Sequence, residues 1–334
     1  MTFLRVRPIL LHGLLVLGVL ALVGWNISTG YVPLASADVL VALFGGGDEK
    51  AVLIVQEIRL PRALLGMVVG FSLGISGAAL QGLLRNPLAE PGLLGVSSMA
   101  GLGAVVVLYF GWAELSPYLL PGAGMTGAFV AVGLLFLLAG REASVLTVIL
   151  AGVAINSLAI ALTSLAMNLA PSPWAVTEML FWVMGSLKDR SLTDLGLVLP
   201  SILLGWGLLL SCARPLDALT LGEDTARSLG LNLRSIQLRL VGGVALCVGA
   251  GVAVAGSIAF VGLVVPHLLR PLVGHQPSRL LIASGLGGAL LTMLADLAVR
   301  SLETNPEMNL GVFTAVIGAP FFLYLILKTR RDMR

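Results

Sequence analysis

Charge is scarce in this chain. Only 11% of its 334 residues are Asp, Glu, Lys or Arg, whereas 57% are hydrophobic and the mean hydropathy is +1.01. Soluble domains are about one quarter charged, so this composition excludes an ordinary water-soluble globular enzyme. It also excludes a disordered chain, because so much apolar surface cannot remain in water. A polytopic membrane protein remains, and the 41 glycines suit helices that pack closely in a bilayer.

Ionisable residues are also missing from the apolar stretches. Ionisable side chains within a bilayer are costly and mark ion pathways. The first Asp or Glu of the expected spans is Asp296, at the outer end of the stretch 280–295, and His12 and His267 are isolated from each other in the sequence. An ion- or proton-coupled secondary transporter is therefore the disfavoured alternative.

Signatures of catalysis and nucleotide binding are absent as well. A P-loop needs Gly-Lys-Ser/Thr, and no lysine of this chain follows a glycine. The cysteines, Cys212 and Cys247, have neither CxxC nor metal-ligand spacing, so we expect buried free thiols. No nucleophile with its base and no metal-ligand set is recognisable. The sequence predicts no enzyme, no metal site and no cofactor bound by this chain, so uphill transport would need energy from a partner.

Apolar stretches define the expected spans, at about 20 residues per crossing. Residues 240–269 are too long for one upright helix and are expected to break near Gly256 and Ser257. Residues 1–37 are expected to contain a first span rather than a cleaved signal peptide. Residues 174–187 are expected to form a short helix against the outer face. The stretches cover residues 8–29, 63–84, 93–112, 119–139, 145–169, 195–212, 240–269, 280–295 and 310–327.

Basic residues at both termini set the topology. Arg5, Arg7 and the C-terminal KTRRDMR favour the cytoplasm, and two cytoplasmic termini require an even number of crossings. Splitting the long stretch gives ten crossings and leaves 14 of the 20 Lys and Arg residues inside. The expected fold is all-α, a polytopic membrane protein with ten transmembrane helices, both termini cytoplasmic, and a single transmembrane domain over residues 1–334.

Three features carry the functional argument. Arg59 and Arg62 precede the second span, and exposed arginines there either anchor to headgroups or pair with carboxylates of a docking protein. Arg300 follows Asp296 by four residues, which predicts an ion pair on one helix face.

The cytoplasmic loop, about 213–234, holds a short helix that is either a solvated connector or a docking element. Gly- and Pro-rich stretches 77–95 and 256–270 predict irregular helices lining a path.

Taken in order, these motifs resemble the FecCD-type permeases, the transmembrane subunits of type II ATP-binding-cassette importers for ferric siderophores, haem or vitamin B12. The resemblance runs essentially end to end. It rests on RLPR at 59–62, QGLLRNPLAEPG at 81–92, the segments 221–230 and 256–270, Ala295-Asp296 with Arg300, and GAPF at 318–321.

The resemblance implies roles for particular residues. The family's outer arginines receive glutamates of a periplasmic binding protein, which here implies Arg59, Arg62 and Arg300. Its gate between the fourth and fifth spans maps near Ser144 and Val145. Its coupling helices press into a cleft on the ATPase, and the matching residues are Asp217, Leu221, Gly222, Glu223, Ala226, Arg227, Leu229 and Gly230.

The resemblance also implies location, cargo and partners. The expected protein is a multi-pass permease of the bacterial inner (plasma) membrane that moves a bulky metal chelate from periplasm to cytoplasm. Ferric siderophore or haem is favoured, with cobalamin as a further candidate. ATP and Mg²⁺ would be bound by a separate ATP-binding-cassette ATPase. A periplasmic substrate-binding protein, a second permease copy (a homodimer rather than a heterodimer) and membrane lipid complete the partners. No nucleic acid is expected, and a non-transporting membrane scaffold is the remaining alternative.

Overall fold

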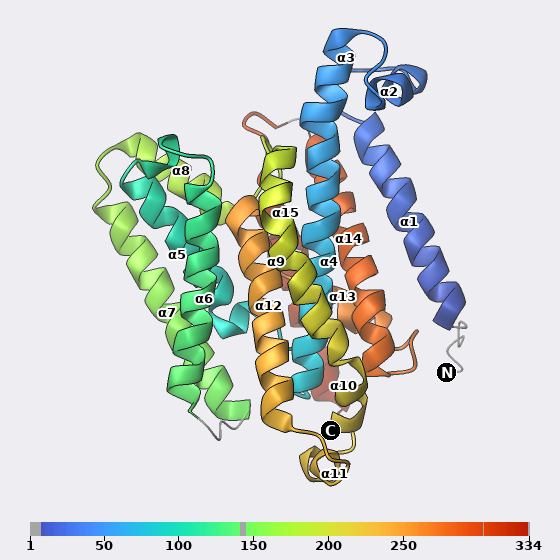
Figure 1. The fold of residues 1–334 in the computed structure, drawn as a ribbon, viewed down its shortest axis with the longest axis vertical. Coiled ribbons are helices and arrows are strands. Elements are labelled where there is room, and N and C mark those ends of the chain that lie inside the picture. Colours follow the sequence, from blue (N-terminus) through green and yellow to red (C-terminus); the bar gives the residue numbers. More distant parts are fainter. Residues whose placement is uncertain (1–7, 141–144, 303, 333–334) are drawn as a thin grey trace.

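The computed structural model describes residues 8–140, 145–302 and 304–332, and every regular element in these ranges is a helix. Long helices run side by side to form one bundle (Figure 1). The elements, in chain order, are α1 (Pro8–Ser28), α2 (Ser36–Leu43), α3 (Glu49–Leu53), the π-helical η1 (Ile54–Arg59), α4 (Leu60–Leu83), the 3-10 turn η2 (Pro91–Leu94), α5 (Val96–Tyr109), the 3-10 turn η3 (Trp112–Glu114), α6 (Leu119–Ala139), α7 (Val145–Asn168), α8 (Pro173–Met184), α9 (Leu192–Ser211), α10 (Ala213–Leu219), α11 (Glu223–Ser228), α12 (Leu233–Ala255), α13 (Val261–Leu269), α14 (Pro277–Ser301) and α15 (Leu310–Asp332).

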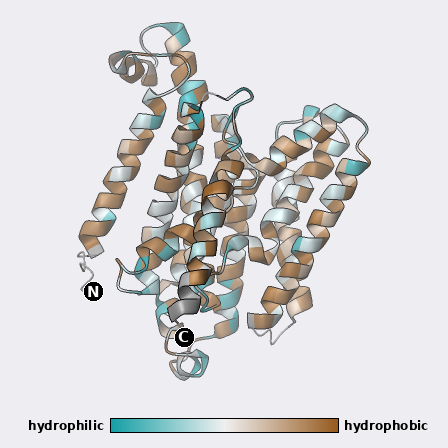
Figure 2. Ribbon diagram, turned by 180° about the vertical axis from the view of Figure 1, so that it is seen from behind, coloured by the Kyte–Doolittle hydropathy of each residue, from teal (hydrophilic) through white to brown (hydrophobic). Residues whose placement is uncertain are grey.

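The predicted multi-span, all-helical architecture is confirmed in its broad form. Seven helical segments of the described chain are long and apolar enough to cross a membrane, namely α1, the continuous α3–η1–α4, α6, α7, α9, α12 and α14. Hydrophilic residues gather mainly toward the two ends of the bundle (Figure 2). Ten crossings additionally require α5, α13 and α15, so the number ten stays a prediction.

The long apolar stretch breaks where the sequence predicted. Helix α12 ends at Ala255 and α13 begins at Val261. Between them Gly256 adopts φ +65°, and a Cβ there would collide with the Trp182 carbonyl oxygen. Phe260 also adopts a positive φ of 67°. A left-handed residue cannot continue a right-handed helix, so the chain turns at this point.

The two ends of the bundle carry different short elements. Helix α1 begins and α15 ends at the end that also bears α10 and α11, here named the inner end after the predicted topology (Figure 1). Helices α2, α3 and α8 lie at the opposite, outer end (Figure 1). The predicted short outer helix over 174–187 is thus present as α8, and the Ser172 hydroxyl accepts the Ala175 N–H at 3.2 Å to cap it.

Helices α4, α12 and α14 form the buried centre, because most of their residues are enclosed by other helices. Between α4 and α14 the backbones nearly touch. A Cβ on Gly70 would lie 2.5 Å from the Gly288 carbonyl oxygen, and one on Gly74 would overlap the Ser284 carbonyl. Small residues let helices in a bilayer approach this closely, and dispersion contacts then hold them. The pair α4–α14 is the scaffold on which both ends of the molecule are built.

We predict that Gly74→Ala destabilises the protein by about 1–3 kcal/mol or more, because the added methyl must push the two backbones apart. Gly133→Ala is the matched control, since nothing lies within 4 Å of a Cβ at Gly133. Thermal unfolding of both variants in detergent measures the difference. Equal unfolding temperatures would show that the close contact is not what holds the pair.

Candidate functional site

The outer end of the α4–α14 pair is closed by a buried ion pair. Arg62, in the first turn of α4, donates from Nε to both Asp296 carboxylate oxygens at 3.0 Å and from Nη2 to Oδ1 at 2.8 Å. Arg62 is 8% exposed and Asp296 1%. A planar guanidinium matches a carboxylate in this forked geometry, which makes the pair strong and directional. It fixes the start of α4 against the end of α14.

Arg300 ties the same cluster to the end of α1. Its Nε lies 3.2 Å from Asp296 Oδ2, which confirms the predicted i,i+4 pair. Its Nη1 donates to the Thr29 carbonyl at 2.8 Å, and its Nη2 donates to the Asn26 side-chain oxygen. Asp296 is therefore shared by two arginines, one from each helix of the pair.

A second carboxylate, Glu307, reaches Arg62 from the loop between α14 and α15. Glu307 Oε2 accepts from Arg62 Nη1 at 3.4 Å, and Oε1 accepts from Nη2. The Tyr31 hydroxyl donates to the same carboxylate at 3.3 Å. Partial burial raises the pKa of Tyr31 and the negative charge of Glu307 raises it further, so the hydroxyl keeps its proton for this bond.

Arg59 donates to backbone carbonyls of the chain around the end of α1. Its Nη1 donates to the carbonyls of Ile27 at 3.1 Å and Ser28 at 2.8 Å, and its Nη2 donates to the Val32 carbonyl. The guanidinium lies against Gly30, where a Cβ would come within 2.8 Å of its Nε. Three arginines and two carboxylates thus leave the cluster one positive charge in excess.

The structure brings Arg59, Arg62 and Arg300 together, as a shared role requires, but it corrects the expectation that they are exposed. They are 4%, 8% and 8% exposed, because the chain between α1 and α2 and the loop before α15 cover them. The sequence did not reveal Glu307 or Asn26 as partners, since 245 and 274 residues separate them from the arginines that they contact. Pairing with a docking protein stays a prediction.

At the inner end, Asp217 of α10 caps α14. Its Oδ1 accepts the Ser278 N–H at 2.8 Å and its Oδ2 accepts the Gln276 side-chain N–H at 3.0 Å. The residue at the N-cap of α14, Gln276, makes no capping bond of its own. A carboxylate at a helix N-terminus satisfies free N–H groups and complements the helix dipole. Asp217 thereby fastens the predicted coupling loop to the central helix pair.

The predicted coupling residues lie together in a loop that projects from the inner end (Figure 1). Leu221 is 65% exposed and Leu229 61%, whereas Ala226 is fully buried beneath them. The exposed Glu223 carboxylate and Arg227 guanidinium are 4.0 Å apart. An exposed ion pair at this distance contributes little to the stability of the protein. Gly222 and Gly230 take φ of +106° and +80° and end the helix on both sides. Their coupling role stays a prediction.

The two Gly- and Pro-rich stretches contact each other, which the sequence did not reveal. The Glu90 carboxylate accepts the Phe260 N–H at 2.7 Å, and the Gln81 side-chain oxygen accepts from Arg270. A Cβ on Gly77 would overlap the Gly262 carbonyl. These contacts supply partners for backbone and side chains where the helices are interrupted. They fix α13 against the end of α4.

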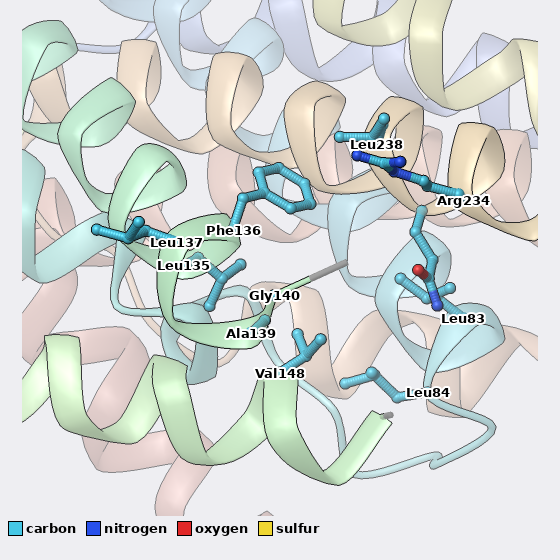
Figure 3. A pocket seen from close by; sticks show the side chains of 11 residues that line it. Leu83, Leu84, Leu135, Phe136, Leu137, Ala139, Gly140, Val148, Arg234 and Leu238 are labelled. Atoms are coloured by element: carbon cyan, nitrogen blue, oxygen red, sulfur yellow. The ribbon is translucent and has the colours of Figure 1, made fainter. Parts of the chain in front are cut away.

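The predicted gate region borders a pocket at the inner ends of α4, α6, α7 and α12 (Figure 3). Ser144 lies outside the described residues, and Val145 is the first residue of α7. The pocket, about 310 Å³, is lined by leucines, by Gly140 and Val148 on either side of the gate segment, and by Arg234. Its polar lining residues are Arg234 and Gln237. The gate assignment stays a prediction.

No cluster of three or more His, Cys, Asp or Glu side chains with metal-binding geometry occurs in residues 8–140, 145–302 and 304–332. Cys212 and Cys247 are free and buried, as predicted. The described residues thus present paired charges at the outer end and exposed leucines at the inner end.

Comparisons with known proteins identify the family to which the chain is similar. The FecCD transport family matches residues 14–328. The hemin transport system permease protein HmuU of Yersinia pestis is 41% identical over 287 residues, covering 83% of this chain and 84% of that protein. The Fe(3+)-citrate import system permease protein YfmE of Bacillus subtilis is 35% identical, covering 96% of this chain and 95% of that protein. The vitamin B12 import system permease protein BtuC of Citrobacter koseri is 37% identical over 89% of this chain and 90% of that protein.

A solved structure has the same fold. It is an inward-facing conformation of a metal-chelate type ABC transporter, with a TM-score of 0.84 and 31% sequence identity. The match covers 96% of this chain and all of that one.

We predict that Asp296→Asn destabilises the protein by about 3–5 kcal/mol, because it removes the carboxylate that two buried arginines share. Asp189→Asn is the control, since that carboxylate is 84% exposed and its nearest lysine nitrogen is 3.9 Å away. Thermal unfolding in detergent reports the cost. A loss no larger than in the control would mean that Glu307 alone suffices for the arginines.

Proposed function

We propose that this chain, which belongs to the FecCD transport family and is the permease subunit of an ATP-binding-cassette importer in the inner (plasma) membrane, imports a bulky metal chelate into the cytoplasm. Ferric siderophore or haem is the proposed cargo, with cobalamin as the alternative. The names of the relatives support this choice of cargo, since these proteins belong to transport systems for hemin, ferric citrate and vitamin B12.

One observation carries the proposed mechanism. The α4–α14 pair runs between the two ends of the bundle, with Asp217 capping its inner end and Asp296 clamping its outer end. A closely packed pair moves as a unit, because its backbones cannot slide without collision. Displacement of the inner loop can therefore reach the outer cluster, as an alternating-access transporter requires.

A separate cytoplasmic ATPase is the proposed energy source, binding ATP and Mg²⁺ itself. No lysine of the chain has the Gly-Lys-Ser/Thr context of a P-loop. On the inner loop, Leu221 and Leu229 expose their side chains, and burying each in a partner's cleft would contribute about 1.5–3 kcal/mol. Glu223 and Arg227 lie between them in the sequence, and their charges would orient the loop in the cleft of the partner.

A periplasmic substrate-binding protein is the proposed partner at the outer end. The arginine cluster there has one more positive than negative charge, which favours acidic partners. The proposed topology has ten crossings and both termini in the cytoplasm, and residues 1–334 form a single permease domain. A second copy of the chain would complete a homodimer with a path between the two copies.

An ion-coupled carrier is the weaker alternative. Asp296, the carboxylate buried in α14, is engaged by both Arg62 and Arg300. Both oxygens of the Asp296 carboxylate are occupied by guanidinium groups, so this carboxylate is not available to hold a transported cation.

The test is co-purification of the tagged chain from native membranes in mild detergent. The expected companion is a stoichiometric P-loop ATPase. Leu229→Asp should reduce its recovery at least about tenfold, because the proposed contact would then bury a carboxylate in place of the exposed Leu229 side chain. Thr225→Asp, at an exposed position of α11 in the same loop, is the matched control. Normal ATPase recovery with Leu229→Asp would contradict the assigned docking surface.

A further inference from the structure

Arg62 pairs with two carboxylates that differ in how firmly they are held. Asp296 lies on α14, is 1% exposed, and also pairs with Arg300. Glu307 lies on the loop after α14, and its carboxylate also accepts from the Tyr31 hydroxyl at 3.3 Å. The residues just before it, Thr304 to Pro306, are exposed, whereas the Glu307 side chain itself turns inward and is 6% exposed. One partner is thus part of the scaffold, and the other is carried by a surface loop.

We propose that Glu307 is an internal competitor that occupies Arg62 until a carboxylate of the docking binding protein replaces it. This inference rests on the proposed function, because it concerns the docking of that protein at the outer end. It assigns a role to a residue that contacts the arginine cluster from outside the helix pair.

Charge balance makes such an exchange feasible. Breaking a buried ion pair by removing one partner is strongly destabilising, since the other charge is left without compensation. When one carboxylate replaces another, Arg62 keeps two acceptors throughout, and the released Glu307 regains water. Asp296 cannot leave in the same way, because its departure would also leave Arg300 without its carboxylate.

The exchange would also couple docking to the loop that leads into α15. Glu307 is three residues before Leu310, the first residue of α15. While it is bound, this loop is fastened to Arg62 on α4 and to Tyr31 beyond α1. Once a partner's carboxylate takes Arg62, both fastenings are released. An acidic group at the right position, rather than general negative charge, would be needed to release them.

The experiment measures docking of the purified substrate-binding protein of this importer to the assembled transporter in nanodiscs. Glu307→Gln is expected to tighten docking roughly tenfold at low salt, because Arg62 is then left with a single ionic partner. Glu307→Asp keeps the charge with a shorter reach and should fall between Gln and wild type. Glu57→Gln makes the same charge change on an exposed residue of η1 and should leave the affinity unchanged.

Separate readouts distinguish the two proposals. A photo-crosslinker replacing Leu302, which is 50% exposed at the end of α14, captures the binding protein if docking occurs at the outer end. Absence of that crosslink would overturn both the docking proposal and the competitor role. A crosslink with unchanged or weaker docking of Glu307→Gln and Glu307→Asp would overturn the competitor role alone. Thermal unfolding of each variant shows whether weaker docking comes from misfolding, in which case Glu307 is a structural partner and the inference fails.

Discussion

The contact between α4 and α14 is the constraint on which the rest of the structure depends. At Gly70, Gly74 and Gly288 there is no space for a side chain between the two backbones. In a bilayer, where lipid is as apolar as the helices, such close packing replaces the hydrophobic effect as the source of helix association. The pair forms the buried centre together with α12, while α1, α6, α7 and α9 lie around it with most of their surface uncovered.

Both functional ends follow from this pair. At the outer end, Arg62 from α4 and Arg300 from α14 share Asp296, so a charge that would be costly alone is balanced by opposite charges from both helices. At the inner end, Asp217 accepts the Ser278 N–H in the first turn of α14, one of the N–H groups that lack a partner within the helix. Under the proposed function, a docking event at either end would therefore act on the same closely packed helix pair.

Local patterns in the sequence predicted the local features. Apolar runs located the long helices, Gly256 located the break after α12, and the four-residue spacing of Asp296 and Arg300 predicted their ion pair. Features made by distant residues were not predictable. Arg62 meets Asp296 across 234 residues, and Asp217 caps Ser278 across 61. The burial of the arginines was missed for the same reason, since it depends on how the chain after α1 folds over them.

The most direct test reconstitutes the permease in proteoliposomes with its ATPase and its binding protein and follows uptake of ferric siderophore, haem and cobalamin. The account predicts uptake of one of these chelates that requires ATP hydrolysis and the binding protein and is insensitive to ion gradients. Uptake driven by a proton or sodium gradient in the absence of the ATPase would contradict it.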